Sequence, residues 1–188
     1  MLTQVQPIFF CRDPIQGPDV IRSQSRRPDN FLLDYNATFD LLAHTPEGNH
    51  AGMMFFSDHG TPDGWTNFHG YGCHTFKWYV KHVAIDLPPL TYGRVNKEGK
   101  FVYIKYHFLA DKGQKQLSRQ EAVELSGENP DYSKQELWEK IERGEYPSYT
   151  AYVQVMEPEE ADPAKLGFDP FDVTKVWPRK QFPVSTNH

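Results

Sequence analysis

The residues best suited to chemistry in this sequence lie close together, between positions 59 and 74. His59, His69, Cys73 and His74 follow one another there, and imidazole and thiolate groups are common zinc ligands. Structural zinc sites usually combine a Cys-x₂₋₄-Cys pair with a His-x₃₋₅-His pair, whereas here only His69-x₄-His74 has such a spacing. If this stretch is a strand, those two side chains point to opposite faces. The spacing therefore weighs against a metal site.

Other catalytic signatures are missing from the sequence. It contains no Gly-x-Ser-x-Gly elbow and no phosphate-binding loop. The acidic pair Glu159-Glu160 stands beside a proline, which is typical of a solvated surface. Three arginines, Arg22, Arg26 and Arg27, form the densest basic segment. Such a segment is typical of a solvated loop, and the alternative interpretation is a binding site for phosphate or carboxylate.

Length and composition set limits on the elements that could position these groups. A chain of 188 residues suits one domain or part of a larger one. Its 13 Phe, 10 Tyr and 4 Trp argue against disorder, but the small aliphatic share predicts that the chain does not bury a complete core alone. The net charge of −5, without a basic stripe, argues against a nucleic-acid partner.

Two further features of the sequence predict the cellular compartment of the protein. No apolar run approaches the roughly 20 residues that cross a bilayer, so we expect no membrane partner. Cys11 and Cys73 do not make a disulfide framework. We therefore expect an intracellular protein in a reducing compartment.

Periodicity and turn signals predict an antiparallel α+β chain rather than alternating βαβ units. Frequent prolines predict irregular structure over residues 1–50, apart from a helical turn at 40–42. The capping boxes that begin at Ser118 and Ser133 predict two short helices, which end near Gly127 and Gly144. Turns are expected at 61–64 and 96–99, and strands at 7–10, 74–78, 101–109 and 149–156.

The clearest predicted strand, residues 101–109, has two chemically different faces. Val102, Ile104, Tyr106 and Phe108 alternate along one face. Lys105 and His107 lie on the other face, which the pattern marks as polar.

Several segments, in this order along the chain, resemble the haem catalase family, in particular its peroxisomal fungal branch. They are Pro7–Ile15, Phe56–Gly64, His69–Trp78, Lys105–Phe108, Asn129–Tyr132, Tyr146–Thr150 and Phe168–Pro178. The resemblance implies that residues 1–188 are a partial catalase core domain. Its fold would be an incomplete antiparallel β-barrel with short helices and a Pro-rich tail. The implied enzyme is a haem-dependent catalase that converts hydrogen peroxide to water and oxygen, as a homotetramer in peroxisomes or cytoplasm.

The resemblance also implies where haem would lie. Phe9 and Phe10 match an aromatic pair on the distal side, and Cys73 and His74 match a Ser-His pair near the proximal side. The family's distal His lies upstream of Pro7, and its proximal Tyr lies downstream of the Trp-Pro segment. The family's Asn falls at Val5-Gln6. We therefore expect no catalytic residue and no metal ligand within these 188 residues.

A second cofactor pocket is implied on the barrel surface, where many catalases bind NADPH. The residues that match it are His50, Ser57, Tyr71, Val176 and Trp177. Four positions depart from the family pattern: His59 replaces Arg, His69 replaces Asn, Leu109 replaces Lys and Arg179 replaces His. The loss of an Arg and a Lys removes two phosphate partners, which makes NADPH a doubtful cofactor.

One segment has no counterpart in the family pattern. Residues 79–94 separate the Phe-Lys-Trp strand from the expected turn, and we interpret them as an insertion or a retained intron. Three functional hypotheses remain open at this point. The chain is a catalase, a catalytically inactive catalase fragment, or a nucleotide-binding remnant.

Overall fold

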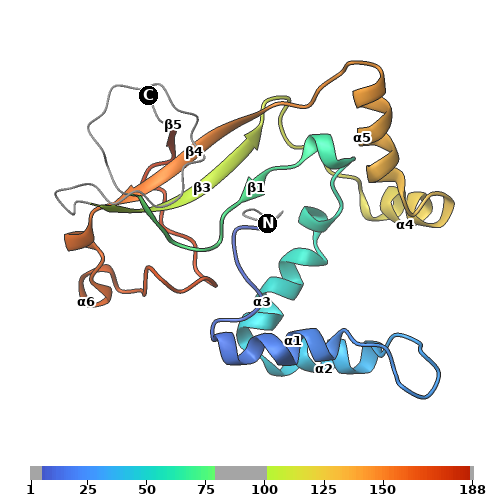
Figure 1. Cartoon of the computed structure of the whole chain (residues 1–188), viewed down its shortest axis with the longest axis horizontal. Helices are drawn as coiled ribbons and strands as arrows, with labels where there is room; N and C mark the ends of the chain where they lie inside the picture. Colours follow the sequence, from blue (N-terminus) through green and yellow to red (C-terminus); the bar gives the residue numbers. More distant parts are fainter. Residues whose placement is uncertain (1–5, 79–100, 187–188) are drawn as a thin grey trace.

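The computed structural model describes residues 6–78 and 101–186, which form a mixed α+β structure. Figure 1 shows three parts: a lobe of helices α1–α3, a twisted antiparallel sheet, and a pair of helices α4 and α5 beyond the sheet. The expected insertion at 79–94 and the expected turn at 96–99 lie outside the described residues.

The first fifty residues are more helical than we expected. They form α1 (Gly17–Ser23), α2 (Tyr35–His44) and the first half of α3 (Pro46–Phe55). Pro18 and Pro46 occupy the first turns of α1 and α3, where a missing backbone N–H leaves no hydrogen bond unmade. The expectation of irregular structure was therefore wrong, because these prolines begin helices instead of breaking them.

The strand expected at residues 7–10 is also absent from the described structure. This segment is a series of bends, linked to the C-terminal tail by a hydrogen bond from the Phe9 N–H to the Val173 carbonyl, 3.0 Å long. Its neighbour is a loop rather than a strand, so no ladder of hydrogen bonds can form.

The sheet is built around the long strand β3 (Val102–Ala110). Its order is β1-β3-β4-β5, and β2 also pairs with β3; all these pairs are antiparallel. The other strands are β1 (Gly70–Tyr71), β2 (Phe76–Trp78), β4 (Tyr149–Met156) and β5 (Ser185–Thr186). Within the described residues the sheet is open, so the expected barrel is represented only by an antiparallel sheet.

The two faces of β3 alternate as predicted, yet both are buried. Val102 and Ile104 pack with Val153 on one face. On the other face, the tail after β4 supplies Trp177 and Phe182, which form a second core with Met156. This tail, which includes α6 (Pro163–Leu166), also covers the side chains that the sequence pattern placed on the polar face of the strand.

Helices α4 (Arg119–Glu128) and α5 (Tyr132–Glu142) differ in how they begin. The predicted capping box of Ser118 and Glu121 is present. The box predicted at Ser133 is wrong, because α5 begins two residues earlier than that cap implies, after Asp131, and without a side-chain cap.

The predicted turn at 61–64 anchors α5 to the rest of the chain. Asp63 accepts a hydrogen bond from the Tyr132 hydroxyl at 2.9 Å, and the hydroxyl of Thr66 donates to Glu136 at 2.5 Å. Gly64 closes this turn with φ +79°, a conformation that glycine adopts without strain.

Candidate functional site

Three of the four residues expected beside haem lie together. The ring of Phe9 lies 5.3 Å from the ring of His74, centroid to centroid, and His74 Nδ1 is 3.2 Å from Cys73 Sγ. Phe10 points elsewhere, and its ring packs 6.2 Å from that of Phe55 on α3.

Each of these contacts continues into a row of aromatic rings. On the sheet, His74 is followed by Phe76 at 6.5 Å, and Phe76 by Tyr106 at 5.1 Å. The row on the helical lobe runs from Phe10 through Phe55 and Phe56 to Phe39. Sequence reasoning assigned Tyr106 only to a core face and did not find that Phe76 and Tyr106 extend the wall beside His74.

A buried ammonium group lies behind this aromatic wall. Lys105 is 3% exposed, and its Nζ donates hydrogen bonds to the carbonyls of Cys73, at 2.8 Å, and Lys175, at 3.0 Å. Burial lowers the Lys105 pKa from 10.5 to about 8. Lys105 thus connects the loop that carries His74, strand β3 and the tail.

Two ionisable groups next to Lys105, the Cys73 thiol and the His74 imidazole, are held in their neutral forms. Burial raises the pKa of the Cys73 thiol, and the nearby Lys105 charge only partly opposes this. Burial, with a smaller contribution from Lys105, lowers the pKa of His74. Because the thiolate is the reactive form of cysteine, Cys73 is suited to packing rather than to nucleophilic catalysis.

A second polar group lies on β1, β3, β4 and the residue before β1, on the face that the tail covers. Rings of His69, Tyr71 and His107 follow one another edge to face, with centroids 6.3 and 5.8 Å apart. His107 Nε2 lies 3.0 Å from Gln154 Oε1. The amide of Gln154 in turn donates to the Trp177 carbonyl at 3.3 Å.

Two buried imidazole atoms near this group lack hydrogen-bond partners within the described part of the chain. They are Nδ1 of His59 and Nδ1 of His107. Burial lowers the pKa of His69 and of His107, and the Arg179 charge adds to the effect in both. His69 and His107 are therefore held neutral next to the Arg179 guanidinium group.

The residues expected to bind NADPH are divided between these regions. Tyr71 and Trp177 are buried in the polar group, whereas Val176 is 54% exposed. His50 lies exposed on α3. Ser57 Oγ donates to the Met54 carbonyl at 2.6 Å and also caps the following turn. The structure thus brings only part of the expected pocket together.

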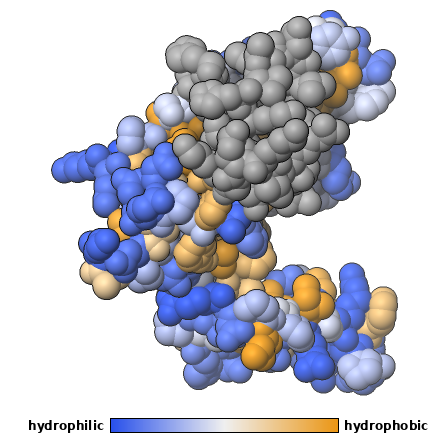
Figure 2. All heavy atoms as spheres, turned by 60° about the vertical axis from the view of Figure 1, so that its left-hand side comes forward, coloured by the Kyte–Doolittle hydropathy of each residue, from blue (hydrophilic) through white to orange (hydrophobic). Residues whose placement is uncertain are grey.

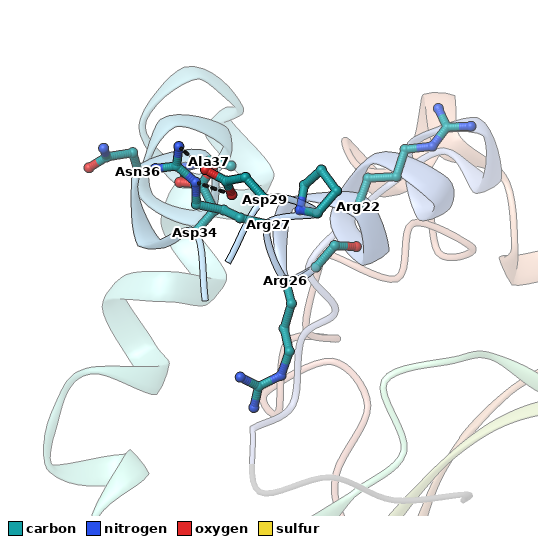
Figure 3. Close-up of a pocket in the computed structure, with 9 residues that line it drawn as sticks. Arg22, Arg26, Arg27, Asp29, Asp34, Asn36 and Ala37 are labelled. Carbon is teal, nitrogen blue, oxygen red and sulfur yellow. Dashed lines mark hydrogen bonds and ion pairs between the residues drawn. The ribbon is translucent and has the colours of Figure 1, made fainter. Parts of the chain in front are cut away.

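The arginine-rich segment lines a hollow of about 490 Å³. Arg27 pairs with Asp29, and the Arg26 guanidinium donates to the Phe31 carbonyl at 3.0 Å. Figure 3 shows the guanidinium groups of Arg22 and Arg26 pointing in different directions. They do not converge on one anion, which agrees with a solvated loop.

Two classes of site receive no support from the described residues. In residues 6–78 and 101–186, no three side chains of His, Cys, Asp or Glu group in a way that would hold a metal ion. Within the same ranges, every helix is too short or too polar to span a bilayer.

Comparison with known proteins shows the family. The family model described as Catalase matches residues 1–86 and 89–187. The chain belongs to the catalase family. It is 43% identical over 178 residues to the peroxisomal catalase of Pichia angusta, and 42% identical over 181 residues to peroxisomal catalase A of Saccharomyces cerevisiae. Each alignment covers 95% of this chain and 32% of the relative.

Solved catalase structures share the fold over the same region. A fungal catalase crystal structure superposes with a TM-score of 0.80 at 40% identity, and it covers 97% of this chain and 33% of that chain. Catalase A from Saccharomyces cerevisiae gives 0.78, also at 40% identity, covering 97% of this chain and 34% of that one. This catalase-family chain therefore spans about a third of the length of the relatives it matches.

Proposed function

We propose that this chain is one section of a haem-dependent catalase that converts hydrogen peroxide to water and oxygen. The observation that carries the proposal is the aromatic wall of Phe9, His74 and Phe76, in a chain that matches the catalase family almost throughout. In the proposed enzyme the open sheet forms part of an antiparallel barrel.

The aromatic wall would border a flat porphyrin, with Phe9 toward the distal side and His74 toward the proximal side that the resemblance implies. Phe9 is half-buried, and its ring lies against that of His74, tilted by 58°. When bound, haem would supply the iron at which peroxide is oxidised and reduced. The role of Phe9 and Phe76 would be to pack against the macrocycle and exclude water. Lys105 would fix the backbone of the loop that carries His74.

We further propose that these 188 residues contribute no general acid or base and no iron ligand. The resemblance assigns the distal His, the distal Asn and the proximal Tyr to positions where this sequence has no equivalent. General acid–base catalysis contributes about 10²–10⁴ in rate, so the chain alone would release little oxygen from peroxide. The purified chain mixed with haem should show no tyrosinate-ligated spectrum and no oxygen release above that of free haem.

A chimera tests the catalase assignment directly. The 181 aligned residues would replace the matching third of the Saccharomyces cerevisiae enzyme. We expect the chimera to bind haem and to release oxygen from peroxide. Phe9→Ala in the chimera should weaken haem retention, whereas the exposed control Met53→Ala should not. A folded chimera without haem would refute the proposal.

Nucleotide binding is the second candidate, supported by the buried group of His69, Tyr71 and His107 next to Arg179. The residues present do not fit NADPH well, because two phosphate partners are lost and His50 is directed to solvent. We propose that this face does not hold NADPH at physiological concentration. Enhanced NADPH fluorescence on addition of the chain, abolished by Tyr71→Ala, would revive this alternative.

Assembly and location follow from the same proposal. We propose that the complete enzyme acts in peroxisomes, because two of the relatives named above are peroxisomal catalases, and that it is the homotetramer that the family resemblance implies. A fluorescently tagged chain that remains in the cytoplasm would contradict the peroxisomal assignment. The origin of residues 79–94 stays a prediction, which transcript sequencing would decide.

A further inference from the structure

The ring of Phe9 is carried by a segment, residues 8–13, that links the sheet to the helical lobe. Figure 1 shows the first described residues running from beside the sheet toward α1. In the view of Figure 2, the lobe of α1–α3 is the lower part of the molecule and joins the rest through a narrower waist. The attachments of this segment on either side therefore set where the Phe9 ring lies relative to His74.

One attachment of the segment is a backbone hydrogen bond to the C-terminal tail. The Phe9 N–H donates to the Val173 carbonyl at 3.0 Å. The residues around Phe9 are bends, and they form no ladder of hydrogen bonds that would hold their orientation. A segment held only at this bond could still turn about it, so a second attachment is needed to fix the direction of the ring.

Arg12 and Asp172 supply the second attachment. Arg12 Nε lies 2.9 Å from Asp172 Oδ2. The other carboxylate oxygen, Oδ1, accepts hydrogen bonds from the Thr174 N–H at 2.9 Å and from the Thr174 hydroxyl at 2.6 Å. Hydrogen bonds to a carboxylate are stronger than those between neutral groups. One oxygen of Asp172 thus holds the segment of Phe9, and the other is held by the tail itself.

The surroundings of Asp172 keep its carboxylate charged and fixed in place. The side chain is 9% exposed, and further residues packed on the same fold could only lower that fraction. Burial by itself would raise the pKa of Asp172, but the Thr174 hydrogen bonds, together with Arg12 and Lys175, bring it below its ordinary value. Because the Arg12 side chain is 55% exposed, Asp172 is the fixed partner of this ion pair.

The same tail holds the loop that carries His74. The Thr75 hydroxyl donates to the Pro170 carbonyl at 2.7 Å. Lys105 also joins this loop to the tail, through the two carbonyls described above. The tail is therefore a common support for both rings, and the ion pair of Asp172 is the side-chain link between that support and the segment of Phe9.

On its other side, the segment is anchored to helix α3. The Arg12 N–H donates to Gln16 Oε1 at 3.3 Å, and the Gln16 amide donates to Glu47 on α3 at 2.5 Å. The Phe10 ring packs on Phe55 of the same helix. Arg12 thus lies between two supports, the tail and the helical lobe, and its ion pair with the tail sets how they meet.

We propose that Asp172 is a positioning residue for haem, which through Arg12 holds the Phe9 ring in its contact with His74 at the border of the porphyrin. This inference rests on the proposed catalase function, in which the two rings border the haem. In this role Asp172 touches neither haem nor peroxide and acts only through the segment that it holds.

Nuclear magnetic resonance of the chain without haem tests the positioning itself. We expect a nuclear Overhauser contact between the ring protons of Phe9 and His74, and a weaker contact in Asp172→Asn and in Arg12→Gln. Asp172→Asn keeps the shape of the side chain and removes its charge. Arg12→Gln alters a half-exposed side chain and decides the question if Asp172→Asn fails to fold. Asp29→Asn, which breaks an exposed ion pair with arginine, is the matched control and should leave the contact unchanged.

The haem-loaded chimera described above tests the consequence for the cofactor. Asp172→Asn and Arg12→Gln should each speed the transfer of haem to apomyoglobin by at least about tenfold, and should change the Soret circular dichroism of folded molecules. A residue that only stabilised the fold would lower the melting temperature without changing that Soret signal. Asp29→Asn should change neither the transfer rate nor the spectrum.

A double variant tests whether the two residues act as one pair. If Asp172 acts through Arg12, the variant with both changes should lose haem no faster than the faster single variant, because their interaction is already broken. Fully additive effects would overturn the role of the pair, as would an unchanged contact between the Phe9 and His74 rings in both single variants. A chimera that binds no haem would refute the proposed function. A chimera whose haem retention and Soret signal ignore both changes would overturn this inference alone.

Discussion

Replacing Lys105 by methionine should remove a specific pH dependence of stability. The folded pKa of Lys105 is about 8 against 10.5 for an ordinary lysine. The unfolded chain therefore binds more protons than the folded chain between these values, and stability rises with pH across this window. A shift of this size corresponds to about 3 kcal/mol. The buried charge destabilises the fold fully below pH 8, and this effect is gone above pH 10.5.

Urea denaturation followed by tryptophan fluorescence measures this effect at a series of pH values under reducing conditions. The free energy of unfolding of the wild-type chain should rise relative to that of Lys105→Met by up to about 3 kcal/mol between pH 8 and pH 10.5. The subtraction cancels the titration of groups that both proteins share. Lys112→Met, which removes an exposed lysine, should behave like wild type.

The loss of two hydrogen bonds sets the behaviour of Lys105→Met at neutral pH. The variant leaves the Cys73 and Lys175 carbonyls without their donor, which costs about 1–3 kcal/mol for each buried group. Removal of the desolvated charge offsets much of this loss. Equal pH slopes in wild type and Lys105→Met would refute the reasoning, because they would mean that Lys105 keeps an ordinary pKa in the folded chain.

Three further predictions concern folding. Gly64→Ala should destabilise the chain by about 1–3 kcal/mol in thermal denaturation, because φ is positive and the new Cβ would lie 2.6 Å from Glu136 Cδ. The control Gly127→Ala on α4 has open space for the new Cβ and should stabilise the chain by about 0.5–1 kcal/mol. Ser118→Ala should weaken α4 by about 1 kcal/mol through loss of its cap, visible as faster amide exchange confined to that helix. Stability should fall as pH drops below 6.5, because burial lowers the folded pKa of His107 and the unfolded chain therefore takes up the proton first. His107→Gln should reduce this loss of stability at acid pH, and a pH dependence of stability equal to that of wild type would contradict the reasoning.

Local sequence signals predicted the regular elements well where the pattern was long or the cap was complete. Strand β4 begins and ends where the alternation of Ala151, Val153 and Val155 predicted, and the box at Ser118 marks the start of α4. The helices of the first fifty residues were missed because proline was interpreted as a helix breaker, although it also begins helices.

The candidate site was predictable only in part, because its geometry depends on contacts between distant segments. The resemblance brought Phe9, Cys73 and His74 to attention, and the structure places them together. The burial of Lys105 and His107 could not be read from β3 itself. Alternation assigns a residue to a face, but only the tail about 70 residues later decides whether that face meets water.

The central position of β3 has a consequence for the order of folding. Helices α4 and α5 are held by contacts between residues close in sequence and can form as soon as they are synthesised. Ile104 on β3 can pair with Val155 on β4 only after β4 has been synthesised. Pairings so distant in sequence form slowly, and an unpaired strand is prone to aggregate while it waits. On the ribosome, the interval between the emergence of β3 and of β4 is therefore when a chaperone would be of most use to this chain.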